Sequence, residues 1–483
     1  MTYTASSMKH GRRGAFAVVL VAGFMTLLDV SIVNVALPSI DASLGASEAA
    51  VQLIVAGYSL TFGLLLVAAG RAGDIFGRRR LFMIGVAGFV VTSLGCGLAP
   101  TAQWLVFLRL LQGGFAGILN PQVLGLIQDL FKGNERAKAF GGYGVMVGIS
   151  TALGPLIGGL LIAFIGSEHG WRAVFLINVP IGLVLVPLAY RWLPRSNGTK
   201  TRWSWKLFDP IAMVLLGGAV VTIMWPFLVA SEGGAGLASA PLWLIAVGLL
   251  ILAVLWGWER IWVRQGGAPL IDSRLFRSAS YILGVATGFT YFAGFTSIFV
   301  VVTLYFQQGL GFTPLQAGLA QMPFAIASGA AAGMSGALVG RFGRTVPVIG
   351  SMTMLISVMG VGIVTAVVPE SQVAWWIIGI LALAGIGSGL VISPNQALTL
   401  DKVPAEAAGV AAALLQTMQR MGTSIGLAVV ITTFFMGISS RGYQTGASWA
   451  MWVITALIFA TVVLNLVDRF RRQEGKQDAS SIA

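Results

Sequence analysis

The sequence predicts an all-α integral membrane protein with fourteen membrane-spanning helices. Two observations lead to this fold class. Of the 483 residues, 57% are hydrophobic and only 10% are charged, whereas soluble domains carry about 25% charged residues. In addition, apolar stretches of about 20 residues, the length that crosses a bilayer as a helix, recur along the whole chain. A chain of this composition cannot cover itself with a water-soluble surface.

The apolar stretches follow one another with short connections, which leave no room for a soluble domain. The first stretch is long, carries Asp29 and lacks a convincing cleavage site, so it is interpreted as a membrane helix and not as a signal peptide. The predicted spans are residues 14–37, 49–69, 81–99, 103–127, 138–165, 172–192, 209–230, 241–262, 279–306, 316–339, 346–367, 373–398, 407–435 and 448–467.

The positions of Lys and Arg predict the orientation. They gather in the two tails and in the loops after even-numbered spans, which the positive-inside rule assigns to the cytoplasm. The sequence therefore predicts a multi-pass protein of the cell membrane with both termini on the cytoplasmic side. The net charge of +13 is then explained by topology and attraction to anionic lipid, with no role for nucleic acid. The single cysteine, Cys96, excludes an intrachain disulfide framework.

Two pairs of similar segments indicate an internal repeat. "GRAGDIFGRRRLF" after the second span is similar to "GALVGRFGRTVPV" after the tenth, and "GILNPQVL" is similar to "LVISPNQAL". Both pairs are separated by about 270 residues, the length of eight spans. The sequence therefore predicts a six-helix bundle over residues 1–195, a linker with two extra transmembrane helices over 196–265, and a second six-helix bundle with the tail over 266–483.

Several motifs resemble those of the major facilitator superfamily, and specifically its fourteen-span drug:proton antiporter family. The resemblance covers nearly the whole chain and implies the major facilitator fold. It departs at Ser150, where the longer fifth-span motif has glycine, and at Gly340, which occupies the place of Asp74 in the second loop copy. The matching segments are "GRAGDIFGRRR", "LLDVSIVNVALP", "LRLLQGGFAG", "GISTALGPLIGG", "GWRAVFLINVPIG" and "QQGLGFTPLQAGLAQMP".

The loop after the second span is expected to act as a conformational latch. Gly70 and Gly77 permit close approach and tight turns, and Arg78 helps to fix the orientation. Asp74 can accept from the free N–H groups at a helix N-terminus. The resemblance implies that this terminus belongs to the thirteenth span, near Ala405, so that the two halves join here in one conformation only. The alternative is a solvated charge cluster that only directs insertion.

Charge inside the membrane marks the expected coupling site, because a charged group near the bilayer centre costs at least about 2.5–3.5 kcal/mol. Asp29 is the one acid well inside the spans, and the helical rise places it ~12 Å and Arg109 ~8 Å from the outer surface. We expect Asp29 to bind a proton and a cationic substrate alternately, while Arg109 adjusts the proton affinity. The alternative is a permanent structural ion pair. Arg420 has no acid within the spans of its half, so it is interpreted as structural, bound to carbonyl groups or in contact with the other half.

The fifth span carries small residues at spacings that suit close helix packing. Its resemblance to the antiporter motif implies a role in conformational coupling, with plain packing as the alternative. The residues of this predicted antiporter motif are Gly148, Gly154, Pro155, Gly158 and Gly159.

Two sets of side chains are candidates for substrate binding. Aromatic residues at helical spacing in the ninth span can stack on aromatic cations, although such stripes also face lipid or neighbouring helices. Polar side chains at or near span interiors are candidates to line a cavity. The aromatic set is Phe292, Phe295 and Phe299, and the polar set is Asn34, Tyr58, Gln112, Asn120 and Asn178.

The sequence thus predicts a proton-coupled multidrug efflux antiporter that exports hydrophobic, cationic compounds by alternating access. Alternatives with the same fold are a dedicated exporter of a metabolite, antibiotic or lipid, and an uptake symporter. An enzyme is not expected, because two histidines, His10 and His169, and one cysteine supply no metal cluster or nucleophile pair. No cofactor is expected, and the proton gradient supplies the energy. The expected partners are small hydrophobic or cationic substrates, protons and the bilayer, with the protein as a monomer.

Overall fold

A computed structural model describes residues 5–194, 209–232, 237, 240–271, 273–401, 403–404 and 407–481. All regular elements within these ranges are helical. Fourteen of the helical segments are long and apolar enough to cross a membrane. The predicted all-α membrane fold with fourteen spans is therefore confirmed.

The first part of the chain supplies six spans from seven helices, because α6 and α7 together form the sixth span, Glu168–Trp192. The bounds are α1 Ala5–Leu44, α2 Glu48–Phe76, α3 Arg78–Gly97, α4 Ala102–Leu130, α5 Gly133–Ile165, α6 Ser167–Leu176 and α7 Asn178–Trp192.

The rest of the chain supplies the two extra spans and the six spans of the second half. The bounds are α8 Pro210–Glu232, α9 Trp243–Arg264, the short η2 Ser273–Arg277, α10 Ala279–Leu304 with its π-helical extension η3 Tyr305–Gly309, α11 Pro314–Ala320, α12 Met322–Phe342, α13 Thr345–Val367, α14 Glu370–Gly389, α15 Ile392–Thr399, α16 Ala408–Arg441 and α17 Tyr443–Ser481.

Local sequence explains where several helices begin. The Ser47 side chain accepts from the Ala50 backbone N–H ahead of α2, and Thr101 does the same for Trp104 at the start of α4. Such caps satisfy backbone donors that have no partner inside the helix. Gly77 separates α2 from α3 with a φ of 93°, a conformation that favours glycine.

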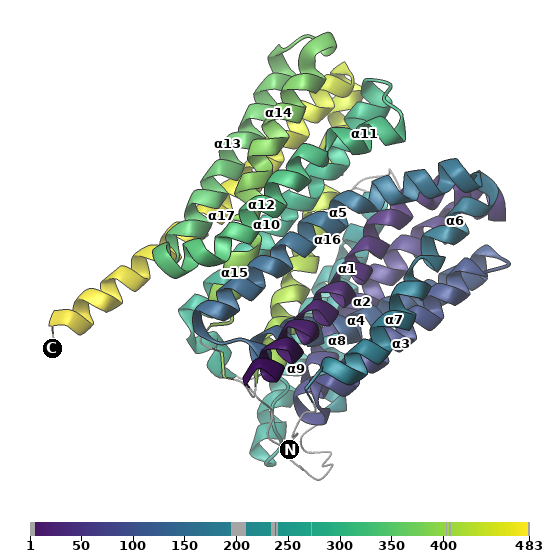
Figure 1. Cartoon of the computed structure of the whole chain (residues 1–483). Coiled ribbons are helices and arrows are strands. Elements are labelled where there is room, and N and C mark those ends of the chain that lie inside the picture. Colours follow the sequence, from purple (N-terminus) through teal and green to yellow (C-terminus); the bar gives the residue numbers. More distant parts are fainter. Residues whose placement is uncertain are drawn as a thin grey trace.

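Figure 1 shows helices α1–α7 in one group and α10–α17 in another, with α5 and α16 along the boundary. The contacts between the groups run mainly through two helix pairs, α2 with α16 and α5 with α12. The helices α8 and α9 pack on each other, and α8 also contacts α2 and α16. The extra helices therefore lie beside the junction of the two groups.

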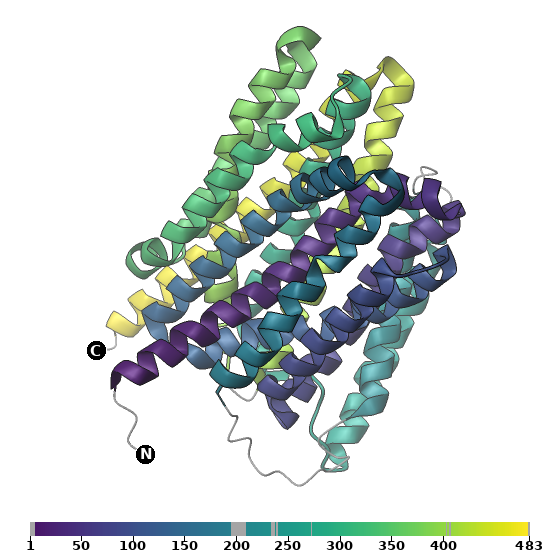
Figure 2. The same ribbon diagram turned by 45° about the vertical axis from the view of Figure 1, so that its right-hand side comes forward.

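Both described ends of the chain lie on the same side of the bundle (Figures 1 and 2). An even number of spans requires this arrangement. We call this side the terminus side. The Gly77 turn between α2 and α3 lies on it too, because α2 is the second span and runs back toward the side from which α1 started.

Candidate functional site

Asp29 and Arg109 form an ion pair inside the first group of helices. The Arg109 Nη1 atom donates to Asp29 Oδ2 over 2.6 Å. Asp29 is 0% exposed and Arg109 is 2% exposed. The pair joins α1 to α4 at a place where neither charge can reach water, so each charge depends on the other.

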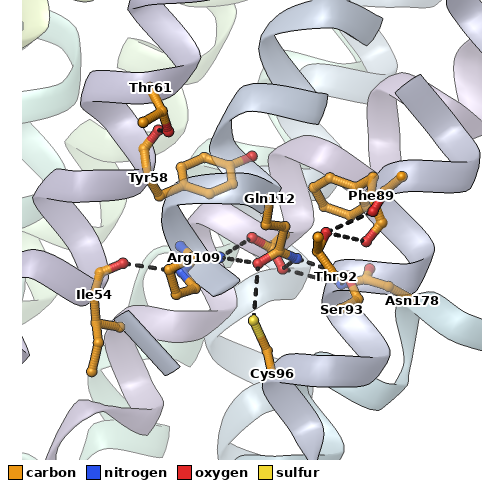
Figure 3. A network of polar contacts seen from close by, with 12 residues as sticks. Ile54, Tyr58, Thr61, Phe89, Thr92, Ser93, Cys96, Arg109, Gln112 and Asn178 are labelled. Carbon is orange, nitrogen blue, oxygen red and sulfur yellow. Dashed lines mark hydrogen bonds and ion pairs between the residues drawn. The ribbon is translucent and has the colours of Figure 1, made fainter. Parts of the chain in front are cut away.

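The second carboxylate oxygen of Asp29 accepts from two amides. Gln112 Nε2 lies 3.0 Å and Asn178 Nδ2 lies 3.1 Å from Asp29 Oδ1. The same two amides also donate to the Ser93 hydroxyl, at 2.7 and 3.3 Å. Figure 3 shows the amides of Gln112 and Asn178 near Ser93, with Arg109 on the other side of Gln112. Helices α1, α3, α4 and α7 therefore meet at one polar cluster around one carboxylate.

Arg109 also ties this cluster to α2. Its Nε atom donates to the Ile54 carbonyl oxygen over 3.0 Å. Its guanidinium carbon lies 4.2 Å from the centre of the Tyr58 ring and 5.6 Å from that of Phe175. Any movement of Arg109 away from Asp29 therefore changes its contacts with α2.

A second polar cluster joins the two groups of helices on the terminus side. Asp74, near the end of α2, accepts from the backbone N–H of Gly409 at 3.1 Å and from that of Val410 at 3.4 Å. Both N–H groups belong to the first turn of α16, where the helix dipole favours an anion. The nearby Ala405 lies outside the described residues. The structure thus places Asp74 against the N-terminus of the thirteenth span.

Arg78 holds the Asp74 carboxylate from the side of its own half. Its Nη2 lies 2.9 Å from Asp74 Oδ1, and its Nη1 lies 2.6 Å from the Gly125 carbonyl oxygen and 2.7 Å from Asp129 Oδ1. Arg78 is buried, whereas Arg80 is exposed. Of these two loop arginines, Arg78 is the one built into the helix junction.

Close backbone approach explains the glycine at the latch. A Cβ atom on Gly70 would lie 2.6 Å from the Gly409 carbonyl oxygen, and one on Gly409 would lie 2.6 Å from the Gly70 carbonyl oxygen. Neither contact is possible for a real side chain without separating α2 from α16. The two helices therefore cross at their glycines, directly beside Asp74.

The predicted antiporter motif faces two different neighbours. Gly148 faces α12 of the other half, near Ser328. Gly154 and Gly158 face α1, near Ser31 and Ile32, whereas a Cβ on Gly159 would meet nothing within 4 Å. The side chain of Pro155 lies outside the described residues. Helix α5 thus packs between the helix that carries Asp29 and the other half of the protein.

The aromatic candidates form a continuous group on α10. The Phe295 ring stacks on Tyr291 and contacts Phe292 and Phe299 edge to face, with centroids 5.2–5.6 Å apart. Phe295 and Phe299 also line a small cavity between the halves, together with Gly148 of the antiporter motif. Phe292 is not among the residues that line it.

The polar candidates are distributed among several places. Gln112 and Asn178 bind Asp29 inside the first group of helices, and Asn120 donates to the Thr26 hydroxyl over 3.3 Å. Tyr58 lies over Arg109, and its buried hydroxyl has no hydrogen-bond partner within the described ranges of the chain. The side chain of Asn34 lies outside the described residues. In this conformation the amides of Gln112 and Asn178 donate to the Asp29 carboxylate and do not face an open cavity.

Sequence reasoning missed Ser93, which accepts from both amides of the Asp29 cluster. Nothing in the pattern of the third span marks this serine. Among the described residues no group of three or more His, Cys, Asp or Glu side chains is arranged to hold a metal ion.

Substitution of Arg78 is expected to impair transport more than substitution of Arg80. Arg78→Ala removes the contacts with Asp74, Asp129 and the Gly125 carbonyl, and leaves the buried Asp74 carboxylate without its neighbouring cation. We expect transport to fall about tenfold, while Arg80→Ala stays within about twofold because surface charges contribute little. Initial rates of substrate uptake into inverted vesicles, normalised to inserted protein, measure this. Equal losses that follow insertion would instead support the purely topogenic interpretation.

Comparisons with known proteins agree on one family. The profile described as Major Facilitator Superfamily matches residues 19–206 and 210–427. The chain is 35% identical over 452 residues to a protein of Streptomyces coelicolor named "Probable actinorhodin transporter", covering 92% of this chain and 77% of the relative. It is 32% identical over 411 residues to "Multidrug resistance protein Stp" of Mycobacterium tuberculosis, covering 84% and 73%.

A solved structure supports the same fold. The proton:xylose symporter XylE shares 16% sequence identity with this chain, with a TM-score of 0.67 over 94% of this chain and 95% of the symporter. At this level of identity the similarity concerns the fold alone.

Proposed function

Because the chain belongs to the major facilitator superfamily and is a transporter of its drug:proton antiporter type, not an enzyme, we propose that it uses inward proton flow to export small hydrophobic molecules from the cytoplasm. The observation that carries the proposal is the fully buried carboxylate of Asp29, well inside the first span, and its connection through Arg109 to α2. In this proposal the terminus side is cytoplasmic, the protein lies in the cell membrane, and it works as a monomer.

Protonation of Asp29 is the first step of the proposed cycle. A neutral carboxyl no longer attracts Arg109, and a proton on Oδ2 would face the donor Nη1 that now lies 2.6 Å away. The guanidinium must therefore move or find another acceptor, because an isolated buried charge is costly. The amides of Gln112 and Asn178 can still donate to Oδ1. Binding of a proton to Asp29 thus breaks its ion pair with Arg109.

Helix α2 carries this local change to the other half. Ile54 and Tyr58, which contact Arg109, lie on the same helix as Asp74, which binds the N-terminus of α16. At ~1.5 Å per residue, Tyr58 and Asp74 are ~24 Å apart along the helix axis. A shift of α2 would therefore act on both clusters, and release of Asp74 from α16 would let the halves separate on the cytoplasmic side.

The antiporter motif on α5 offers a second connection between the Asp29 cluster and the other half. Gly154 and Gly158 pack on α1 close to Asp29, while Gly148 faces α12. We propose that α5 transmits movement of α1 to the other half, and that Phe295 and Phe299 beside Gly148 contact substrate. Asn34, Asn120 and Phe292 stay candidates for contact with substrate.

The experiment is a coupled flux measurement. Purified protein in liposomes with an internal pH-sensitive dye is exposed to a panel of lipophilic cations, neutral drugs and aromatic acids under an imposed pH gradient. We expect at least one compound to drive a proton flux that is absent from protein-free liposomes. Substrate movement that ignores the pH gradient would overturn proton coupling.

A dedicated antibiotic exporter is the second candidate, because one relative is named for a single compound, actinorhodin. The range of panel compounds that the protein transports distinguishes multidrug export from dedicated export. Transport of many unrelated compounds supports multidrug export, and transport of a single chemical class supports dedicated export.

The expectation of cationic substrates required the Asp29 carboxylate to be available to them. Its three donors in this structure do not support that requirement.

A further inference from the structure

Arg420 is the charged side chain of the second half that lies deepest in a span. It is twelve residues into α16, which corresponds to ~18 Å along the helix at ~1.5 Å per residue. Its guanidinium carbon lies 4.4 Å from the centre of the Phe62 ring on α2. Arg420 therefore lies between the two halves, on the same pair of helices that form the Asp74 junction.

No carboxylate of the described residues forms an ion pair with Arg420. Within the described part of the chain, this guanidinium has no hydrogen bond or ion pair, and its side chain is only partly buried. The spans Ala279–Gly309, Leu315–Phe342, Thr345–Val367 and Ala408–Arg441 contain no Asp or Glu. In the first half, the acid that lies well inside a span, Asp29, is bound by Arg109. A cation at this depth normally has a partner or faces a water-filled cavity.

The neighbouring side chains also have unused polar atoms. Tyr58 and Tyr143 both lie close to Arg420, and Gln396 lies beside Tyr143. The Tyr58 hydroxyl and the Gln396 Oε1 atom are buried without a partner among the described residues. Buried polar atoms are rarely left unpaired unless water or a ligand satisfies them. These residues come from α2, α5, α15 and α16, so both halves contribute.

We propose that Arg420 recognises an acidic group, a carboxylate or ionised phenol, on an aromatic molecule that the protein exports. A planar guanidinium suits such oxygens because it can donate two parallel hydrogen bonds. The Phe62 and Tyr58 rings are stacked with centroids 6.2 Å apart and are buried in this conformation. We expect them to contact the rest of the molecule when α2 and α16 separate. A cationic substrate would meet like charge at this place. The inference rests on the proposed export function and specifies its substrate class as anionic.

Two xanthene dyes test the charge preference directly. Fluorescein is anionic and rhodamine 123 is cationic at neutral pH, and their ring systems are similar. Binding of each to the purified full-length protein in zwitterionic nanodiscs is measured by fluorescence anisotropy. We expect fluorescein to bind at least about tenfold more tightly, and Arg420→Gln to remove this preference. Arg420→Lys should keep most of it, because the charge stays.

Arg441→Gln is the matched control, since it removes an exposed arginine from the other end of α16 and should leave both affinities unchanged. Thermal unfolding of each variant accompanies the binding data. A preference for rhodamine 123, no measurable fluorescein binding, or equal changes of both affinities in Arg420→Gln would overturn the proposal. Equal changes would show that Arg420 only stabilises the contact with Phe62.

The failure of this inference is distinguishable from failure of the proposed function. If the protein in liposomes transports rhodamine 123 in response to a pH gradient but the protein in nanodiscs does not bind fluorescein, proton-coupled export stands and the assignment of Arg420 is wrong. If fluorescein binds through Arg420 but no panel compound moves with protons, the assignment stands and proton coupling is wrong.

Discussion

Asp29→Asn is expected to abolish proton-driven export, with a loss of at least about a hundredfold in the gradient-dependent rate. Asn keeps the shape of the side chain and one acceptor oxygen, which Gln112 and Asn178 can still reach, but it cannot exchange a proton. In liposomes, substrate addition should release protons from the wild-type protein and none from the variant.

The Asp29→Asn substitution is also expected to lower the stability of the protein. Removing one partner of a buried ion pair costs about 3–5 kcal/mol, although Arg109 keeps the Ile54 carbonyl and the Tyr58 ring as contacts. The double variant Asp29→Asn with Arg109→Gln removes both charges and should recover most of the thermal stability. It should still lack proton-driven export. A stable double variant without coupling would show that the defect lies in proton exchange.

Ser93→Ala is the matched control for the Asp29 cluster. It removes a hydroxyl that accepts from Gln112 and Asn178 but leaves the titratable carboxyl and its three donors. Proton-driven export should persist with at most about a threefold change. If Asp29→Asn retains export that collapses when the proton gradient is dissipated, the proton travels elsewhere and Asp29 has another role.

The pairing of Asp29 with Arg109 was predictable because few charges occupy the spans and their depths nearly match. The other hydrogen-bond partners of the Asp29 carboxylate were not predictable. Gln112 and Asn178 were expected to line a substrate cavity, since spacing along one helix identifies a polar face but not the helix opposite it. In the structure both amides converge on Asp29 from α4 and α7.

The span positions followed from hydropathy, whereas three helix breaks did not. The sixth, tenth and twelfth spans are interrupted ahead of Pro180, Pro323 and Pro394. Proline lacks the N–H that would bond to the carbonyl four residues earlier. Yet Pro121 lies within the continuous α4, so the sequence alone does not tell which prolines interrupt a helix. Packing by neighbouring helices decides it.

Arg420 shows the same limit from the opposite direction. The absence of an acid in its own half led to a structural interpretation. Contact with the other half was one of the two roles expected, and the guanidinium lies over Phe62 of that half; the sequence did not indicate which residue it would meet. Contacts between residues more than 300 positions apart require the packing of the halves, which no local pattern encodes.

Asp74→Asn is expected to reduce transport at least tenfold while leaving substrate affinity within about twofold. The carboxylate accepts from Gly409 and Val410 at the positive end of α16 and from Arg78. A neutral amide keeps one acceptor but loses the charge. Loss of a charge-assisted contact of this kind weakens the closed junction by about 2 kcal/mol, which shifts the population of closed to open protein by about thirtyfold.

Spin labels at Lys132→Cys and Arg341→Cys, two exposed positions at the ends of α5 and α12 near the terminus side, measure that population by distance distribution. The native Cys96 is buried and should not react. Asp74→Asn should move the distribution toward longer distances. Asp129→Asn is the matched control, because Asp129 also binds Arg78 but is 47% exposed and belongs to the same half. Unchanged distances in Asp74→Asn, or a loss of binding as large as the loss of transport, would show that Asp74 serves a pocket and not a junction between conformations.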